Sequence, residues 1–385
     1  MNSVLMPIRE EKGAPLTWTA FIVLSATLLF TAPSLEGADT LPSQITDTEF
    51  SQMIMDYSEP GGSFNFEFMS NEIEFPSIIP SLKESLKMDG VYLGVGPEQN
   101  FTYIAALQPK IAFIFDIRRQ NMVEHLLYKA LFGLSSNRVD FISKLFARRV
   151  PRGLSEKFTA RELLLAYSTA TADPELFDRN LQAIKDYLIR DHHIPLPARD
   201  QADLNLVYRS FVREGPGGDY TGRIFGGFGR YAYADLMMAT DERGQAQSYL
   251  ATEQNFQLVR EMERKNLVVP LVGDFAGATA IRAVAKYLKD HHATVTAFYT
   301  SNVEQYLFQQ SDEWRRFYEN LSFLPIDSSS TLIRSSHFAY GAGAQRARRF
   351  PRTTYVMLLC PLTDLMAAFK QRQIQTYDDA IRLSR

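Results

Sequence analysis

The chain has 385 residues, of which 45% are hydrophobic and 22% charged, so it can bury a large core and is not a disordered polypeptide. Its formal net charge of −3 argues against a surface that gathers nucleic acid or anionic lipid, because both need a strongly basic face. Cys360 is the single cysteine, which excludes an internal disulfide, and its apolar surroundings in the sequence predict a buried thiol.

The N-terminal segment is typical of an export signal or a membrane anchor. Residues 16–32 are uncharged and mostly apolar, Arg9 and Lys12 precede them, and small residues follow up to Ala38. A buried N-terminal helix is the alternative. We expect residues 1–38 to direct the protein to the periplasm or the extracellular space, or to anchor it in a membrane, with no other membrane contact.

The first half of the core is expected between residues 45 and 135. Residues 111–116 form an unbroken apolar run of the kind that is buried on both faces of a parallel sheet. The helix before this run is expected to end at Leu107, because Pro109 cannot continue a helix and biases Gln108 away from helical angles. In order, the sequence predicts helices at 78–87, 98–107 and 122–134 and strands at 91–96 and 111–116.

The pattern changes between residues 136 and 264, which we interpret as an insertion or lid. Proline and glycine separate its helix-like segments, and a glycine-rich stretch covers residues 215–230. Helices are predicted here at 139–147, 160–170, 174–190 and 253–265.

Strands and helices alternate again from residue 265. Strands are predicted at 267–274, 294–299 and 354–360, with a helix at 278–290. Repeated strand–helix–strand order is typical of a doubly wound α/β sheet. The predicted fold class is therefore α/β, with a mainly parallel, Rossmann-like core from 45–135 and 265–385 and a helical, glycine-rich insertion at 136–264.

Two glycines, Gly94 and Gly96, end the first predicted strand. They let the backbone turn sharply and approach a ligand closely, before a helix whose first residues, including Glu98 and Asn100, can meet polar ligand groups. Asp116 follows Gly94 by 22 positions, close to the spacing at which an acidic residue takes ribose hydroxyls. No third glycine completes the dinucleotide fingerprint, which argues against NAD or FAD. A turn required only by strand–helix geometry is the alternative.

The strand ends resemble those of class I S-adenosylmethionine-dependent methyltransferases. The motifs that carry the resemblance are Leu93-Gly-Val-Gly, Asp116, Val272-Gly-Asp274-Phe and Phe298-Tyr-Thr-Ser-Asn302. The resemblance implies a methyltransferase-like fold in which Gly94 and Gly96 lie against the methionine part of the cofactor. It also implies that Asp116 holds the ribose and Asp274 approaches the adenine. The chain as a whole is similar to a bacterial family without an assigned activity that contains the strings GVGPEQNFTYIAAL, DIRRQN and VGDFAG.

Further polar residues are expected at the same edge of the sheet. Arg118 or Arg119 can clamp a carboxylate or phosphate with its planar guanidinium, with a helix N-terminal turn that is salt-bridged to the surface as the alternative. Asn302 and Glu304 can project into the crevice, although a carboxylate at a helix start is the more common role for Glu304. Tyr220 and Arg223 are expected either in a cover near the mouth of the crevice or in a simple hairpin turn.

The expected ligand is a small molecule that contains a nucleoside, and the resemblance implies S-adenosylmethionine as cofactor and a transferase activity. The alternative is a non-enzymatic ligand-binding or scaffold protein that retains the fold. Two Asp-His-His strings, at 191–193 and 290–292, do not predict a metal site, because adjacent histidines project in different directions. We predict that one pocket is lined by Gly94, Asn100, Asp116, Arg118, Asp274 and Asn302, because the strand ends of a parallel sheet gather along one edge.

Overall fold

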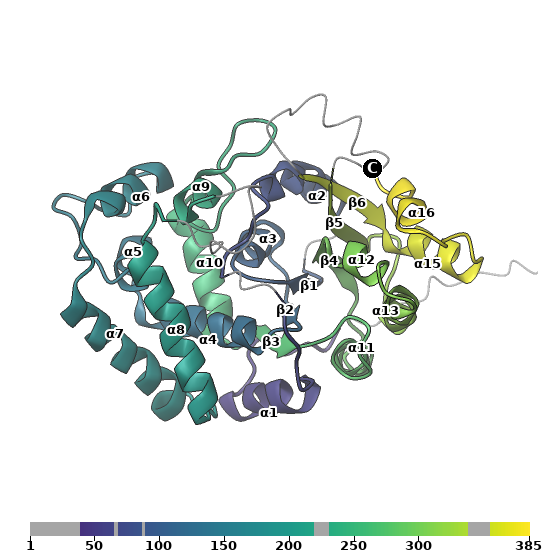
Figure 1. The fold of residues 1–385 in the computed structure, drawn as a ribbon, viewed down its shortest axis with the longest axis horizontal. Coiled ribbons are helices and arrows are strands. Elements are labelled where there is room, and N and C mark those ends of the chain that lie inside the picture. Colours follow the sequence, from purple (N-terminus) through teal and green to yellow (C-terminus); the bar gives the residue numbers. More distant parts are fainter. Residues whose placement is uncertain (1–38, 65–67, 87–88, 219–230, 338–354) are drawn as a thin grey trace, which may run out of the picture. The chain divides into compact units, whose positions relative to one another are not determined.

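A mixed sheet forms the centre of the computed structural model, which describes residues 39–64, 68–86, 89–218, 231–337 and 355–385. Its strands lie in the order β3-β2-β1-β4-β5-β6 (Figure 1). β1 to β5 run parallel, and β6 pairs antiparallel with β5. The strands are β1 (Val91–Val95), β2 (Ile111–Asp116), β3 (Val268–Val272), β4 (Val295–Ser301), β5 (Thr331–His337) and β6 (Tyr355–Pro361).

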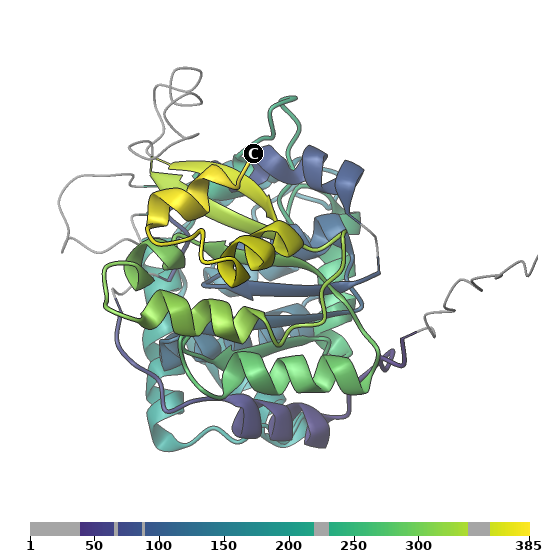
Figure 2. The ribbon, with the colours of Figure 1, turned by 90° about the vertical axis from the view of Figure 1, so that its right-hand side faces the viewer.

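The strands β1, β2 and β3 are buried along their whole length, as the apolar run at 111–116 predicts. Helices cover both faces of the sheet (Figure 1). One face carries α3 (Gln99–Leu107), α4 (Arg119–Leu134) and α10 (Glu253–Arg264), which pack on one another. The other face carries α1 (Asp47–Tyr57), α11 (Ala280–Asp290), α13 (Glu313–Leu321) and α15 (Leu362–Lys370), and Figure 2 shows the green and yellow members of this set side by side. The predicted α/β class and mainly parallel sheet are confirmed, and the strand order is compatible with a Rossmann-like fold.

The chain between β2 and β3 is mostly helical and adds to the face that carries α4. Its helices contact α4 mainly through α8 and α10. Residues 38–385 cluster into one compact unit, so the predicted insertion does not separate from the core. The added helices before α10 are α5 (Arg138–Leu145), α6 (Ala160–Thr169), α7 (Pro174–Asp186), the π-helical turn η2 (Tyr187–Asp191), α8 (Ala198–Glu214) and α9 (Tyr233–Met238).

Several elements were not predicted from the sequence. β5 is the most informative of them, because its central Arg334 is a fully buried charged residue in a strand of mixed polarity. Further unpredicted elements are α1, the 3-10 turn η1 (Phe75–Ile78), α8, α9, α12 (Val303–Leu307), α13, α15 and α16 (Tyr377–Arg382), while the predicted helix at 78–87 is α2 (Ile79–Ser85). The export or anchor segment predicted at 1–38 lies outside the described residues. No helix within the described ranges has the length and apolar character to cross a membrane.

Candidate functional site

The carboxyl ends of the parallel strands meet at a cleft. The strand order reverses at β1, because β2 and β3 lie on one side of it and β4 and β5 on the other. Open α/β sheets bind ligands outside the carboxyl ends of the strands at such a reversal. A cleft of about 580 Å³ lies there. The residues that follow the four strands supply its walls: Gly96 and Pro97 after β1, Ile117 and Arg118 after β2, Asp274 and Phe275 after β3, and Asn302 and Val303 after β4.

Four of the six residues predicted to share a pocket line this cleft, namely Asp116, Arg118, Asp274 and Asn302. Gly96 lines it as well, with a φ of +78° that favours glycine. These residues come from segments up to about two hundred positions apart, so the convergence follows from the parallel topology of the sheet.

Gly94 and Asn100 do not line the cleft, and the prediction for them was wrong. A Cβ at Gly94 would overlap Oδ1 of Asn100 and approach the ring of Tyr92. The amide of Asn100 donates to the carbonyls of Val95, Gly96 and Pro97 at 2.8–3.0 Å, and the hydroxyl of Tyr92 donates to its Oδ1 at 2.8 Å. Gly94 therefore makes room for the side chain that holds the turn together, whereas Gly96 is the glycine that faces the cleft.

Asp116 and Arg118 form a closed ion pair in the cleft wall. Arg118 donates from Nε to Oδ1 of Asp116 at 3.0 Å and from Nη2 to Oδ2 at 2.7 Å, and its backbone amide donates to Oδ1 at 2.8 Å. Asp116 is 5% exposed and Arg118 is 9% exposed, so water screens this pair weakly. Both carboxylate oxygens of Asp116 are already acceptors for Arg118. A ligand hydroxyl that binds Asp116 has to share these oxygens or displace Arg118.

Asp274 lies in a turn that a distant carboxylate organises. Its Oδ1 accepts from the amide of Ala276 at 2.9 Å. Glu59 accepts from the amides of Asp274 at 2.7 Å and Thr279 at 2.8 Å, just before α11 begins. Glu59 was missed in the sequence, where no motif marks it and its partners lie more than two hundred residues away.

A segment before the core crosses the edge of the sheet beside the cleft. We call residues 58–64 and 68–72 the cover segment. The amide of Glu59 donates to the carbonyl of Val272 at 2.8 Å, and the amide of Gly62 donates to the carbonyl of Ile117 at 2.8 Å. The ring of Phe64 meets that of Tyr306 edge to face, with centroids 5.0 Å apart. Both rings line the cleft, so the cover segment and α12 each contribute an aromatic ring to its wall.

A family model for a domain of unknown function, DUF7790, matches residues 68–381. The chain belongs to the DUF7790 family. No curated protein matches the sequence. In this DUF7790 chain, the matched stretch contains all the strands of the sheet and every strand end that lines the cleft, but it starts after Glu59 and Phe64.

The wall of the DUF7790 cleft contains a buried carboxyl group beside the end of β4, that of Glu72, which was not predicted from the sequence. The hydroxyl of Tyr299 donates to Glu72 at 2.6 Å and that of Ser301 donates to it at 2.5 Å. Burial raises the pKa of Glu72, and these hydrogen bonds act in the opposite direction. Gln99 lies beside them, is 3% exposed, and has no described partner for its Oε1. This oxygen is an acceptor at the cleft that a ligand donor can use.

Glu98 was predicted to bind the ligand, but it points into the interior beneath the turn. It is fully buried, and its Oε1 accepts from the amide of Ser70 in the cover segment at 3.3 Å. Burial raises the pKa of Glu98 to about 8. Glu124, also fully buried, has its pKa raised well above the usual range by burial and then by the charge of Glu98, and burial lowers the pKa of His125 to about 4. Glu98 therefore packs in the interior behind the cleft wall and does not face a ligand.

Glu304 is also not part of the cleft wall. Its carboxylate pairs with Nε of Arg334 at 2.8 Å and accepts from the hydroxyl of Tyr318 at 2.6 Å. Both members of the ion pair are at most 1% exposed. Glu304 is a structural partner of β5, whereas Asn302 and Val303, which precede it, line the cleft.

Tyr220 and Arg223, predicted near the mouth of the crevice, lie outside the described residues. In the described part of the chain, no group of three or more histidine, cysteine, aspartate or glutamate side chains is arranged to hold a metal ion. His192, from the first Asp-His-His string, instead contacts the carboxylate of Asp47 at 2.9 Å.

Proposed function

We propose that the cleft of this DUF7790 protein binds a small molecule that contains a nucleoside, and that S-adenosylmethionine is this molecule. The observation that carries the proposal is the convergence of Gly96, Asp116 and Asp274 at the point where the strand order reverses. These are three of the positions to which the methyltransferase resemblance assigns the methionine part, the ribose and the adenine. Their convergence in one cleft favours the fold-level resemblance over a turn that serves only the backbone.

The walls of the cleft suit such a molecule in size and polarity. A volume of about 580 Å³ falls within the usual range for small-molecule sites, which is about 300–1,000 Å³. Ile117, Phe275 and Leu307 offer apolar surface to a purine ring. Among the described lining residues, Arg118 is the only cation, and Asp116 already neutralises it. Asp274 then favours a ligand of net positive charge, which S-adenosylmethionine has because its sulfonium and ammonium groups outweigh its carboxylate.

The ion pair between Asp116 and Arg118 is the feature of the cleft that does not fit a bound ribose as it stands. Both oxygens of Asp116 accept from Arg118, so ribose binding requires Arg118 to rotate away or to share the carboxylate. When bound, the cofactor supplies a methyl group on a positively charged sulfur. The residues of this chain bind and orient that molecule, and the cover segment limits its contact with water.

Isothermal titration calorimetry tests the proposal. S-adenosylmethionine, S-adenosylhomocysteine, adenosine and NAD are titrated into the full chain and into Asp116→Ala and Asp274→Ala variants. We expect an adenosyl compound to bind, and each substitution to weaken it at least tenfold. The control is Asp200→Ala, which removes an equivalent bidentate pair, that of Asp200 with Arg119, outside this cleft. If no adenosyl compound binds, or if both cleft variants keep the wild-type affinity, the proposal fails.

The second candidate function is ligand binding without catalysis. The observation that favours it is that the charged groups in the wall are engaged with one another, Asp116 with Arg118 and Glu72 with Tyr299 and Ser301. Binding of S-adenosylhomocysteine as tight as that of S-adenosylmethionine, without turnover of any methyl acceptor, is the result expected for a binding protein.

Export or membrane anchoring by residues 1–38 stays a proposal based on their sequence. S-adenosylmethionine is made in the cytoplasm, so the location of the cleft decides whether the proposed ligand can reach it. Fractionation of cells that carry reporter fusions after residue 38 separates an exported protein from an anchored one with a cytoplasmic domain. A reporter that stays active in the soluble cytoplasmic fraction would contradict both export and membrane anchoring.

A further inference from the structure

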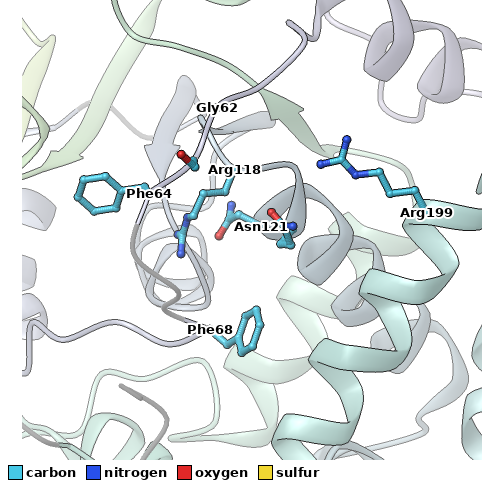
Figure 3. Close-up of a pocket in the computed structure, with 8 residues that line it drawn as sticks. Gly62, Phe64, Phe68, Arg118, Asn121 and Arg199 are labelled. Atoms are coloured by element: carbon cyan, nitrogen blue, oxygen red, sulfur yellow. The ribbon is translucent and has the colours of Figure 1, made fainter. Parts of the chain in front are cut away.

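A smaller pocket of about 140 Å³ adjoins the cleft and shares Ser63, Phe64 and Arg118 with it. This volume has room for one compact polar group and not for a whole nucleoside. Figure 3 shows Arg118 and Asn121 at its centre, with Phe64 and Phe68 on two sides and Arg199 reaching towards it from α8. The pocket is therefore a side chamber whose wall includes the same Arg118 that lines the cleft.

The side chamber is lined by a cation that makes no described ion pair. Arg199 is exposed and has no hydrogen-bond or ion-pair partner among the described residues. The acidic groups beside it are engaged elsewhere, since Asp200 pairs with Arg119 at 2.6 Å and Asp116 with Arg118 at 2.7 Å. Asp203, one turn further along α8, makes no described ion pair with Arg199, and the pKa of Arg119 is raised first by its hydrogen bond to Asp200 and less by the charge of Asp203.

The first turn of α4 faces the same chamber through Arg118, Gln120 and Asn121. Arg118 occupies the N-cap, but its side chain makes no cap hydrogen bond, and the amides of Arg119 and Gln120 have no described partner, so this helix start can attract an anion. Asn121 is an independent observation. It is 3% exposed, its Nδ2 donates to the carbonyl of Gly96 at 3.3 Å, and its Oδ1 has no described partner. A buried acceptor in this state gains from a ligand that donates to it.

We propose that the side chamber binds the anionic end of a second ligand, a carboxylate or phosphate that carries a hydroxyl or amino group beside the charge. Arg199 and the start of α4 hold the anion, and Oδ1 of Asn121 accepts from the neighbouring hydroxyl or amine. Since the chamber opens next to Arg118, this ligand lies beside the molecule in the cleft. That part of the inference rests on the proposed function, whereas anion binding itself does not.

Ligand-observed NMR titrations of the full chain test this without any nucleoside present. The probes are inorganic phosphate, glycolate and acetate, and the comparison of phosphate with glycolate identifies the preferred anion. Glycolate differs from acetate by one hydroxyl group, so we expect it to bind at least threefold more tightly. Arg199→Gln is expected to weaken phosphate and glycolate at least fivefold, and Arg199→Lys to weaken them less.

The matched control is Arg161→Gln. Arg161 is exposed and is the second residue of α6, as Arg199 is of α8, but it lies away from the chamber. Equal weakening by both substitutions, or no saturable binding of any probe, overturns the proposal. Equal affinity for glycolate and acetate overturns the role given to Asn121. Anion binding that persists when no adenosyl compound binds would show that only the proposed function has failed.

Discussion

The pH dependence of stability tests whether Glu98 is as deeply buried beneath the cleft as the structure shows. Glu98 is fully buried, only one of its oxygens has a described partner, and burial raises its pKa from 4.5 to about 8. The folded protein therefore keeps this proton up to about pH 8, whereas the unfolded chain releases it near pH 4.5. Between these values the folded state binds more protons, so stability falls as pH rises. Each pH unit costs about 1.4 kcal/mol, which gives about 4 kcal/mol between about pH 5 and pH 8.

Glu98→Gln removes this titration and keeps an oxygen that can accept from the amide of Ser70. At about pH 5 the variant and the wild type are expected to be similarly stable, since both side chains are then neutral. At about pH 8 the variant is expected to be more stable by roughly 3–4 kcal/mol. Urea unfolding followed by far-ultraviolet circular dichroism across this pH range measures the difference.

The exposed Glu319, whose carboxylate has no described hydrogen bond or ion pair, supplies the control. Glu319→Gln should leave the pH profile parallel to that of the wild type. Parallel profiles for wild type and Glu98→Gln would refute the reasoning, because they would mean that Glu98 has the same pKa in the folded and unfolded states. A variant that is already unstable at about pH 5 would instead show that glutamine does not fit the site.

Three further predictions concern other parts of the molecule. Glu304→Ala leaves the buried Arg334 without its partner, and chemical unfolding should show a loss of about 3–5 kcal/mol, with adenosyl binding unchanged in the folded fraction. Gly96→Ala forces a side chain into a φ of +78°, so thermal unfolding should show a loss of about 1–2 kcal/mol together with weaker adenosyl binding, and unchanged stability would contradict the turn geometry. Deletion of residues 1–38 should leave a soluble protein with the circular dichroism of a folded α/β domain, and an insoluble product would assign the apolar run to the core.

Strands with one clear physical signature were predictable from the sequence. β2 reads as an unbroken apolar run because helices cover both of its faces, and its predicted and observed bounds agree at 111–116. β5 gave no such signal, because Arg334 at its centre is neutralised by Glu304 from a turn 30 positions earlier. A buried charge that is neutralised by a residue distant in the sequence therefore leaves no recognisable strand pattern around it.

The parts of the candidate site that could be predicted are those whose positions follow from the topology of the sheet alone. Asp116, Asp274 and Asn302 share the property that they follow apolar strands, and the parallel sheet brings them together. Gly94 was misassigned because a glycine that admits a neighbouring side chain looks in sequence like one that admits a ligand. The cover segment was missed because its role depends on backbone hydrogen bonds to Val272 of β3 and to Ile117 just after β2, which leave no periodic pattern.

The hydrogen bond from the amide of Asp274 to Glu59 joins residues 215 positions apart, which bears on the order in which the protein is made. During synthesis Glu59 emerges from the ribosome long before β3 exists, and contacts of such wide separation form late in folding. The hydrogen bonds from this turn and from the start of α11 to Glu59 thus form only after β3 has been translated. We infer that a chain terminated before this turn lacks a finished cleft, so ligand binding requires that the chain has been translated beyond β3.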